Sequence, residues 1–432
     1  MTIQFPAPLG DSVLFASVAH YHCATGRFET PIFPLDPSGA YRYVWHAIGH
    51  PALLSWLNPD CSNAGGFFAL SVVLASTFAL AYLVVARQRG AVAGLLFAAV
   101  VFALQAKQGF RPESTAVLLV LGAEWLRHAG KTTPWLLVAG LLAWTQPTTL
   151  ILYAAFAALS SDAALRQRLA TTALQWLPLS IALHLTLWWA YPYPIADLLQ
   201  GLSAQGRIFA QRDDGSVFNY LVRSDFFPLF GLAFAAVYGG SVWRRWPLLG
   251  LLPLLWYVGF RVPATYYNLV PLFVVLLLDL LRARRSETGP AEHGRRMALL
   301  CGVALLACAG LIQSTLRDAG SWLQYGSSMA SAISHERRLA EQGLVACTVP
   351  PWFTLMHPAA DFLPSHVPTL RACPTAAESS RRDLVHAVAL RRRTDAVACE
   401  ARAGDPGRAW IPHVFQSDSG YSFSVCPAAL PR

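Results

Sequence analysis

Charged side chains are scarce in this sequence. Of its 432 residues only 13% are Asp, Glu, Lys or Arg, whereas a soluble domain carries about 25%. Hydrophobic residues make up 55%, and the mean hydropathy is +0.41. So few polar side chains cannot cover a water-facing surface of this size, which excludes a soluble enzyme, a disordered chain and a fibrous repeat. The composition predicts a multi-span membrane protein.

The motifs of soluble enzymes are missing as well. The sequence contains no GxGxxG, P-loop, HExxH or GxSxG pattern. The formal net charge of +9 comes without a basic–aromatic stripe, so we expect no nucleic-acid partner. We attribute the charge to arginine-rich loops that orient membrane helices and attract anionic lipid of the bilayer.

The apolar residues gather into runs that predict about ten membrane spans. A span needs about 20 mostly apolar residues, and the clearest run is 65–86. A Gln-Pro pair at 146–147 separates two shorter runs, since proline ends a helix. The predicted spans are 65–86, 91–106, 114–126, 135–144, 148–159, 173–191, 226–242, 247–260, 266–281 and 297–312.

Every second gap between these runs is rich in arginine, and the positive-inside rule assigns those gaps to the cytoplasm. The other gaps and both ends of the chain then face outward. The predicted fold class is mainly α: a polytopic transmembrane helix bundle with a small C-terminal α/β domain on the outer side. Three units follow: a first outer loop with surface helices (1–63), the bundle (64–315) and the outer C-terminal domain (316–432).

This topology places residues 1–63 on the outer side, but the segment shows no signal that would direct its translocation across the membrane. Residues 1–9 lack the basic and apolar regions of a signal peptide. Either the segment crosses unaided or the natural gene product begins with one more span, and we expect the second. In the C-terminal domain we expect a helix at 322–342, a strand at 344–349 and a hairpin of 410–415 with 421–425.

The positions of the cysteines agree with this topology, because none of them falls in an arginine-rich gap that we assign to the cytoplasm. An even number on the outer side indicates disulfides in an oxidising compartment, although several could be free buried thiols. Cys301 and Cys308 lie seven apart on one face of the last run, where we expect them only to pack. The outer cysteines are Cys23 and Cys61 in the first loop and Cys347, Cys373, Cys399 and Cys426 in the tail, whose pairing stays open among three possibilities.

The first outer loop carries the first candidate residues. Its pattern from residue 13 to 21 predicts an amphipathic helix along the membrane surface, with Asp11 at the start as an N-cap or a catalytic acid. A second short helix fits 43–57. That helix would put His46 and His50 on one face, either as a metal pair or, more simply, as interfacial histidines that hydrogen-bond locally.

The turn at 107–113 places three charges at the mouth of a helix that Pro112 can begin. Arg111 could clamp a phosphate with two N–H groups. The alternative is a surface ion pair that snorkels, formed by Glu113 with Arg111 or with Lys107. Arg261 precedes two tyrosines, Tyr266 and Tyr267, at another outer end. These charges therefore gather on the membrane face where a lipid phosphate would lie.

On these residues the chain resembles GT-C-type membrane glycosyltransferases, the bacterial protein-mannosyltransferase-like and aminoarabinose-transferase-like enzymes. The resemblance spans roughly residues 9–315 and is patchy. Many relatives have two adjacent acids where this chain has Asp11 followed by Ser12, and the first span of the family is absent from this sequence. The similar segments are 10–12, 25–31, 43–51, 111–113 and 266–271.

The resemblance implies a sugar donor linked to polyprenyl phosphate and a lipid, glycan or protein acceptor of the envelope. It implies the inner membrane of a bacterium, with the active site and the C-terminal domain in the periplasm. Asp11 would be the catalytic acid, and Arg111, Lys107 and Arg261 would bind the donor phosphate. The implied pocket residues are His46, His50, Glu113, Tyr266 and Tyr267.

One carboxylate and a phosphate clamp are sufficient for such a transfer. Cations stabilise the leaving phosphate as charge develops on it, and the carboxylate takes the proton of the acceptor hydroxyl. No cofactor is certain; a divalent cation could assist, but its ligands are unknown. The alternatives are a transporter or flippase, which would carry more mid-span charges and repeated halves, and a catalytically inactive member of the fold.

Overall fold

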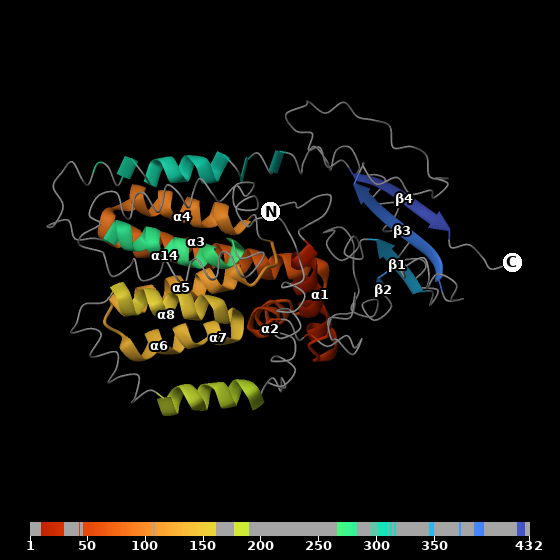
Figure 1. Ribbon diagram of the computed structural model, residues 1–432, viewed down its shortest axis with the longest axis horizontal. Coiled ribbons are helices and arrows are strands. Elements are labelled where there is room, and N and C mark those ends of the chain that lie inside the picture. The colour runs from red at the N-terminus through yellow and green to blue at the C-terminus, as the bar shows by residue number, and fades with distance from the viewer. Residues whose placement is uncertain are drawn as a thin grey trace, which may run out of the picture.

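The structure is a computed structural model. It describes residues 10–29, 43, 46–106, 109–160, 177–189 and 266–282, positions between 294 and 316, and four strands between 345 and 427. This described part is mostly helical and ends in a four-stranded sheet (Figure 1). The prediction of a mainly helical fold is confirmed, and at the C-terminal end the described elements are the four strands of this sheet.

The helices of the bundle follow the apolar runs closely. A glycine with φ of 91°, Gly90, ends the first long helix and reverses the chain into the next, because glycine carries no Cβ that would clash in that conformation. The helices in this group are α3 (Asn63–Arg89), α4 (Ala91–Ala106), α5 (Glu113–His128) and α14 (Tyr266–Arg282).

The predicted break at Gln146–Pro147 is also present. Gln146 adopts an extended backbone, with φ of −154° and ψ of 90°, and Pro147 opens the next helix, where it loses no helical hydrogen bond. The helices on the two sides of the break are α6 (Thr132–Gly140), α7 (Leu142–Thr145) and α8 (Pro147–Ser160), followed by apolar helices at Leu177–Trp189 and Leu300–Ala309.

Among the described residues, one helix is both long and apolar enough to cross a membrane, Ala64–Arg89, with a mean hydropathy of 2.3. The other described helices of the bundle match their predicted runs but are shorter than a full membrane span. α4 and α5 have 16 residues each, or about 24 Å at 1.5 Å per residue, against a hydrocarbon core of about 30 Å. The predicted spans 226–242 and 247–260 lie outside the described residues.

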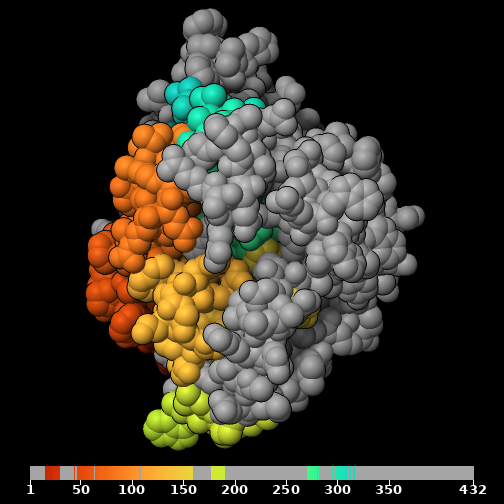
Figure 2. Space-filling model, turned by 90° about the vertical axis from the view of Figure 1, so that its left-hand side faces the viewer, coloured from red at the N-terminus to blue at the C-terminus, as the bar shows by residue number. Residues whose placement is uncertain are grey.

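α3, α4, α5, α8 and α14 share one apolar core. Phe97 and Leu121 are fully buried in it, together with Phe273 from α14, which lies beside α3 and α5 although it follows them by more than 130 residues (Figure 1). Figure 2 views the left-hand end of Figure 1, with the 177–189 helix at one edge and residues 294–316 at the opposite edge.

α1 (Gly10–Thr25) is not the amphipathic surface helix that the sequence predicted. All six residues from Phe15 to His20 are buried, so this stretch of the helix is covered around its whole circumference, whereas Ala24 and Thr25 at its end are exposed. Tyr43, Leu54 and the first turns of α3 provide the cover. Because α1 begins at Gly10, Asp11 lies inside the first turn.

α2 (Gly49–Trp56) is shorter than the predicted helix of 43–57. A helix running through residues 47–51 would place Pro51 in its interior, where the ring clashes with the carbonyl four residues earlier. The helix therefore begins at Gly49, which leaves Pro51 in its first turn. His46 precedes it, so the prediction that His46 and His50 share a helical face is wrong.

The sheet contains β1 (Val345–Val349), β2 (Arg371–Ala372), β3 (Leu384–Arg392) and β4 (Tyr421–Pro427) in the order β2-β1-β3-β4. β1 is parallel to both neighbours, and β3 and β4 are antiparallel. β1 and β4 match the predicted strands, but the described partner of β4 is β3. The expected partner 410–415 and the expected helix 322–342 lie outside the described residues.

The strand register removes one of the three cysteine pairings in the tail. Cys347 and Cys426 both lie opposite Ala387, on the two sides of β3. Strands are about 4.8 Å apart, so the two Cα atoms are about 10 Å apart. A disulfide needs about 4.4–6.8 Å, which excludes a bond between Cys347 and Cys426.

Gly49 gives a test of how closely α2 approaches α7. A Cβ atom at this position would lie 2.5 Å from the carbonyl oxygen of Trp144, and neither backbone can move cheaply. We expect Gly49→Ala to lower the free energy of unfolding by about 1–3 kcal/mol, measured by denaturant unfolding in detergent. Gly140→Ala is the control, because its Cβ would meet nothing within 4 Å. Equal stability of the two variants would contradict the close packing.

Candidate functional site

Three turns of the chain bring polar side chains together at one end of the bundle. They are the start of α2, the turn before α5 and the break between α7 and α8. Five of the described polar side chains that they contribute are each no more than 6% exposed. We call this group the outer polar cluster, after the side that the sequence predicts for this end of the bundle: His50, Arg111, Glu113, Thr115 and Gln146.

Arg111 and Glu113 form the charged centre of the cluster. Arg111 Nε donates to Glu113 Oε2 at 3.2 Å, and Arg111 Nη2 donates to Glu113 Oε1 at 3.0 Å. The ion pair that the sequence allowed is therefore present, but it is buried rather than snorkelling at the surface. Removing one partner of such a pair costs about 3–5 kcal/mol, because the other charge is left without compensation.

Gln146 joins this ion pair from another part of the chain. Its Nε2 donates to Glu113 Oε1 at 3.2 Å, and its Oε1 accepts a hydrogen bond of 2.7 Å from Thr149 Oγ1. The carboxylate can only accept and the hydroxyl of Thr149 needs an acceptor, so these partners determine which way the amide points. The carboxylate is thus held by α5 and by the α7–α8 break.

His50 fastens α2 to the turn before α5. Its Nε2 lies 2.7 Å from the carbonyl oxygen of Phe110 and must donate to it, while Nδ1 lies 2.8 Å from Thr115 Oγ1 and accepts from it. Complete burial lowers the pKa of His50 to about 4, so the ring is neutral at pH 7. With both nitrogens engaged, His50 is the locally bonded histidine and not half of a metal pair.

α1 packs over the cluster through Phe15. The ring centroid of Phe15 lies 4.9 Å from that of His46 and 6.1 Å from that of His50, both edge-on. Asp11 precedes Phe15 by four residues, so the two Cα atoms are one turn apart on the same side of α1. The backbone thus places Asp11 on the side of α1 that faces α2.

A disulfide between Cys23 and Cys61 ties the end of α1 to the segment before α3. Their Cα atoms are 5.5 Å apart, and the bond confirms the predicted use of paired cysteines in the first loop. His22 adds a contact of 2.8 Å to Ser55 and stacks on Phe28. α1 is therefore held against both α2 and α3. Cys301 and Cys308 are unpaired, as expected.

The remaining predicted site residues are described less fully or not at all. Tyr266 and Tyr267 are the first residues of α14, known here by their backbone. Lys107 and Arg261 lie outside the described residues. The structure thus brings together Arg111, Glu113 and His50. The sequence had not identified Gln146, Thr115 and Thr149, although each is a polar residue beside or inside an apolar run, which is a usable signal.

A second buried network lies at the opposite end of α5. Arg127, predicted as a loop cation, is buried and donates to both carboxylate oxygens of Glu124, at 2.8 and 2.9 Å. Tyr153 of α8 donates to Glu124 as well, at 2.9 Å. Glu113 and Glu124 are 11 positions apart on one helix, or about 16 Å. The second network therefore locks α5 to α8 and takes no part in the outer cluster.

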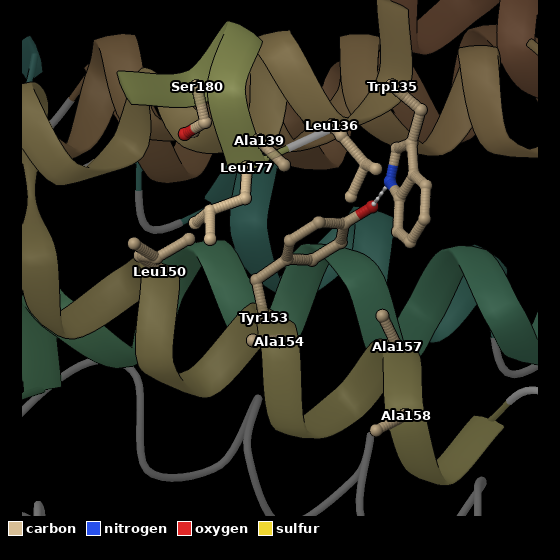
Figure 3. Close-up of a pocket in the computed structure, with 11 residues that line it drawn as sticks. Trp135, Leu136, Ala139, Leu150, Tyr153, Ala154, Ala157, Ala158, Leu177 and Ser180 are labelled. Atoms are coloured by element: carbon tan, nitrogen blue, oxygen red, sulfur yellow. Dashed lines mark hydrogen bonds between the residues drawn. The ribbon is translucent and has the colours of Figure 1, made fainter. Parts of the chain in front are cut away.

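An apolar cavity of about 330 Å³ lies between α6, α8 and the 177–189 helix. Figure 3 shows Trp135 donating to the hydroxyl of Tyr153 on its wall, at 2.8 Å. The rest of the lining is mostly Ala and Leu, with Ser180 as the other hydroxyl. Such a lining offers no group that could drive a transfer reaction, so the outer cluster is the better candidate site.

No protein-family model and no curated protein matches the chain. A solved structure does resemble it: the crystal structure of ArnT from Cupriavidus metallidurans in the apo state. The likeness covers 85% of this chain and 73% of that chain, at 14% sequence identity and a TM-score of 0.43. A likeness at this level assigns neither a family nor a reaction.

The buried state of His50 predicts a pH dependence of stability. Its pKa falls from an ordinary 6.5 to about 4 in the folded protein, so between these values only the unfolded chain binds the proton. Stability is then complete above pH 6.5 and falls toward pH 4, by about 1.4 kcal/mol per pH unit. We expect His50→Gln to remove that part of the slope in unfolding titrations. Parallel curves for the two proteins would contradict the assignment.

Proposed function

We propose that this protein is a membrane glycosyltransferase. It moves a sugar from a polyprenyl-phosphate donor to a lipid, glycan or protein acceptor on the periplasmic side of a bacterial inner membrane. The observation that carries the proposal is the buried pairing of Arg111 with Glu113 at the outer end of α5, beneath the helix that carries Asp11. The resemblance of the same segments to GT-C-type enzymes supports it.

Arg111 suits a phosphate because the guanidinium presents five N–H groups in a planar fork. Two of these N–H groups donate to Glu113, and these two hydrogen bonds fix the orientation of the guanidinium plane. Glu113 also neutralises the charge of Arg111, so an anionic phosphate needs further cations beside it. The resemblance suggests Lys107 and Arg261 for that role. Together they would stabilise the negative charge that develops on the phosphate as the sugar leaves.

Asp11 is the proposed base. In an inverting transfer its carboxylate takes the proton of the acceptor hydroxyl while the acceptor oxygen forms a bond to the anomeric carbon. The bond between that carbon and the phosphate oxygen breaks, and its electron pair leaves with the phosphate. The packing of α1 through Phe15 against His46 and His50 supports a position for Asp11 near the cluster.

The disulfide and the neutral His50 have supporting roles in this proposal. Cys23–Cys61 keeps α1 on the bundle, and His50 holds the turn that carries Arg111 through the carbonyl of Phe110. One carboxylate and a cationic clamp are sufficient for this chemistry, which a divalent cation could assist. Among the described residues no three His, Cys, Asp or Glu side chains gather as a metal site.

The test of this function is Asp11→Asn in a deletion strain complemented with the gene. Loss of a general base reduces the rate by about 100-fold or more, so we expect the glycan product to disappear while the amount of protein stays normal. Mass spectrometry of envelope glycans provides the measurement.

Asp60→Asn is the matched control, because Asp60 is an exposed carboxylate of the same outer loop whose hydrogen bonds from Ser62 lower its pKa. It should restore the glycan fully. An unchanged glycan in the Asp11→Asn strain would remove Asp11 from the mechanism. A deletion strain with the parent's glycans would contradict the proposed function and favour an inactive member of the fold.

A further inference from the structure

We infer that Gln146 is a positioning residue of the phosphate site: it orients Glu113, and through Glu113 the guanidinium of Arg111. The inference rests on the proposed function, because it assigns Arg111 to a phosphate. Gln146 lies 33 positions after Glu113 and on a different helical hairpin. Nothing in the sequence resemblance includes it.

The backbone of Gln146 is itself well held. Its N–H donates to the carbonyl of Leu142 at 2.7 Å, and its own carbonyl accepts from Thr149 and Leu150, at 3.0 and 3.3 Å. Pro147 follows directly and restricts the residue before it to extended backbone, as observed. The residue is therefore anchored by α7 on one side and by α8 on the other.

The side chain continues this rigid arrangement. Thr149 holds the amide oxygen at 2.7 Å, so the amide nitrogen points at Glu113 Oε1, 3.2 Å away. The same oxygen accepts the hydrogen bond from Arg111 Nη2. Glu113 Oε1 thus accepts two hydrogen bonds, one from the rigidly held amide of Gln146 and one from the guanidinium of Arg111. The first bond fixes the carboxylate, and the carboxylate in turn orients the guanidinium. Without the amide, Glu113 loses the hydrogen bond that connects its carboxylate to the α7–α8 break.

Positioning of this kind has a measurable consequence. A phosphate bound by two N–H groups of a planar fork is sensitive to the direction of that fork, whereas an uncharged lipid is not. Loss of the amide should therefore weaken phosphate binding and leave binding of the lipid chain unchanged. A merely structural role of Gln146 would weaken both.

The probes are farnesyl phosphate and uncharged farnesol, titrated calorimetrically into the full-length protein in detergent. For Gln146→Leu, which keeps the volume and removes the amide, we expect about tenfold weaker binding of farnesyl phosphate and unchanged binding of farnesol. Thr145→Val is the matched control, since Thr145 is equally buried in the same turn and its hydroxyl donates to Leu141. This variant should bind both probes like the wild type.

Three results would overturn the inference, and they separate it from the proposed function. If the wild type prefers farnesyl phosphate and Gln146→Leu binds it equally well, Gln146 does not position the site, and the proposed function stands. If Gln146→Leu weakens both probes alike, its role is structural. If the wild type does not distinguish the probes, the phosphate site itself is wrong and the proposed function fails with it. Should Gln146→Leu not fold, Thr149→Val removes the support of the amide and gives the same test.

Discussion

Arg111 and Glu113 carry full opposite charges where almost no water reaches them, and much of the outer end of the molecule is arranged around that fact. A charge in such surroundings is costly unless a partner of opposite sign and further hydrogen bonds satisfy it. Glu113 compensates the guanidinium, and Gln146 satisfies the carboxylate in turn. The need to satisfy these buried charges therefore connects distant turns of the chain, because the hydrogen bond from Gln146 to Glu113 holds the α7–α8 break against α5.

Neutral polar groups close the rest of this end. His50 loses its charge through burial and uses both ring nitrogens to join α2 to the turn before α5. Gly49 allows α2 to approach α7 at backbone distance. The disulfide between Cys23 and Cys61 then holds α1 over the assembled turns. Apolar packing alone would leave the relative positions of these turns loosely specified, because apolar contacts are not directional. The hydrogen bonds and the disulfide have a defined geometry and therefore fix those positions.

The two ends of α5 show how similar residues can serve different purposes. Glu124 and Arg127 form as tight a pair as Glu113 and Arg111, and Tyr153 completes it. That pair joins α5 to α8. It lies at the end of α5 away from the helix that carries Asp11. The outer pair lies beneath α1 and beside three turns. Location in the fold, and not the chemistry of the pair, distinguishes the candidate site from the structural lock.

The sequence by itself predicted the mainly helical fold and the positions of most described helices. Both depend on local properties: the scarcity of charge, the length of apolar runs, the glycine that ends α3 and the proline after Gln146. It also allowed the pairing of Arg111 with Glu113, because two residues so close in the chain can always meet. The error at α2 was local as well, since Pro51 already forbids a helix through residues 47–51.

Tertiary structure alone decided how distant segments meet. It buried the middle of α1 on every side, gave Glu113 a partner 33 residues away and separated Cys347 from Cys426 by a strand. Each of these depends on how whole helices and strands pack. A periodic pattern shows that a face is apolar, but it does not say which surface will cover that face. For that reason the sequence could nominate Asp11 and Arg111 but not Gln146.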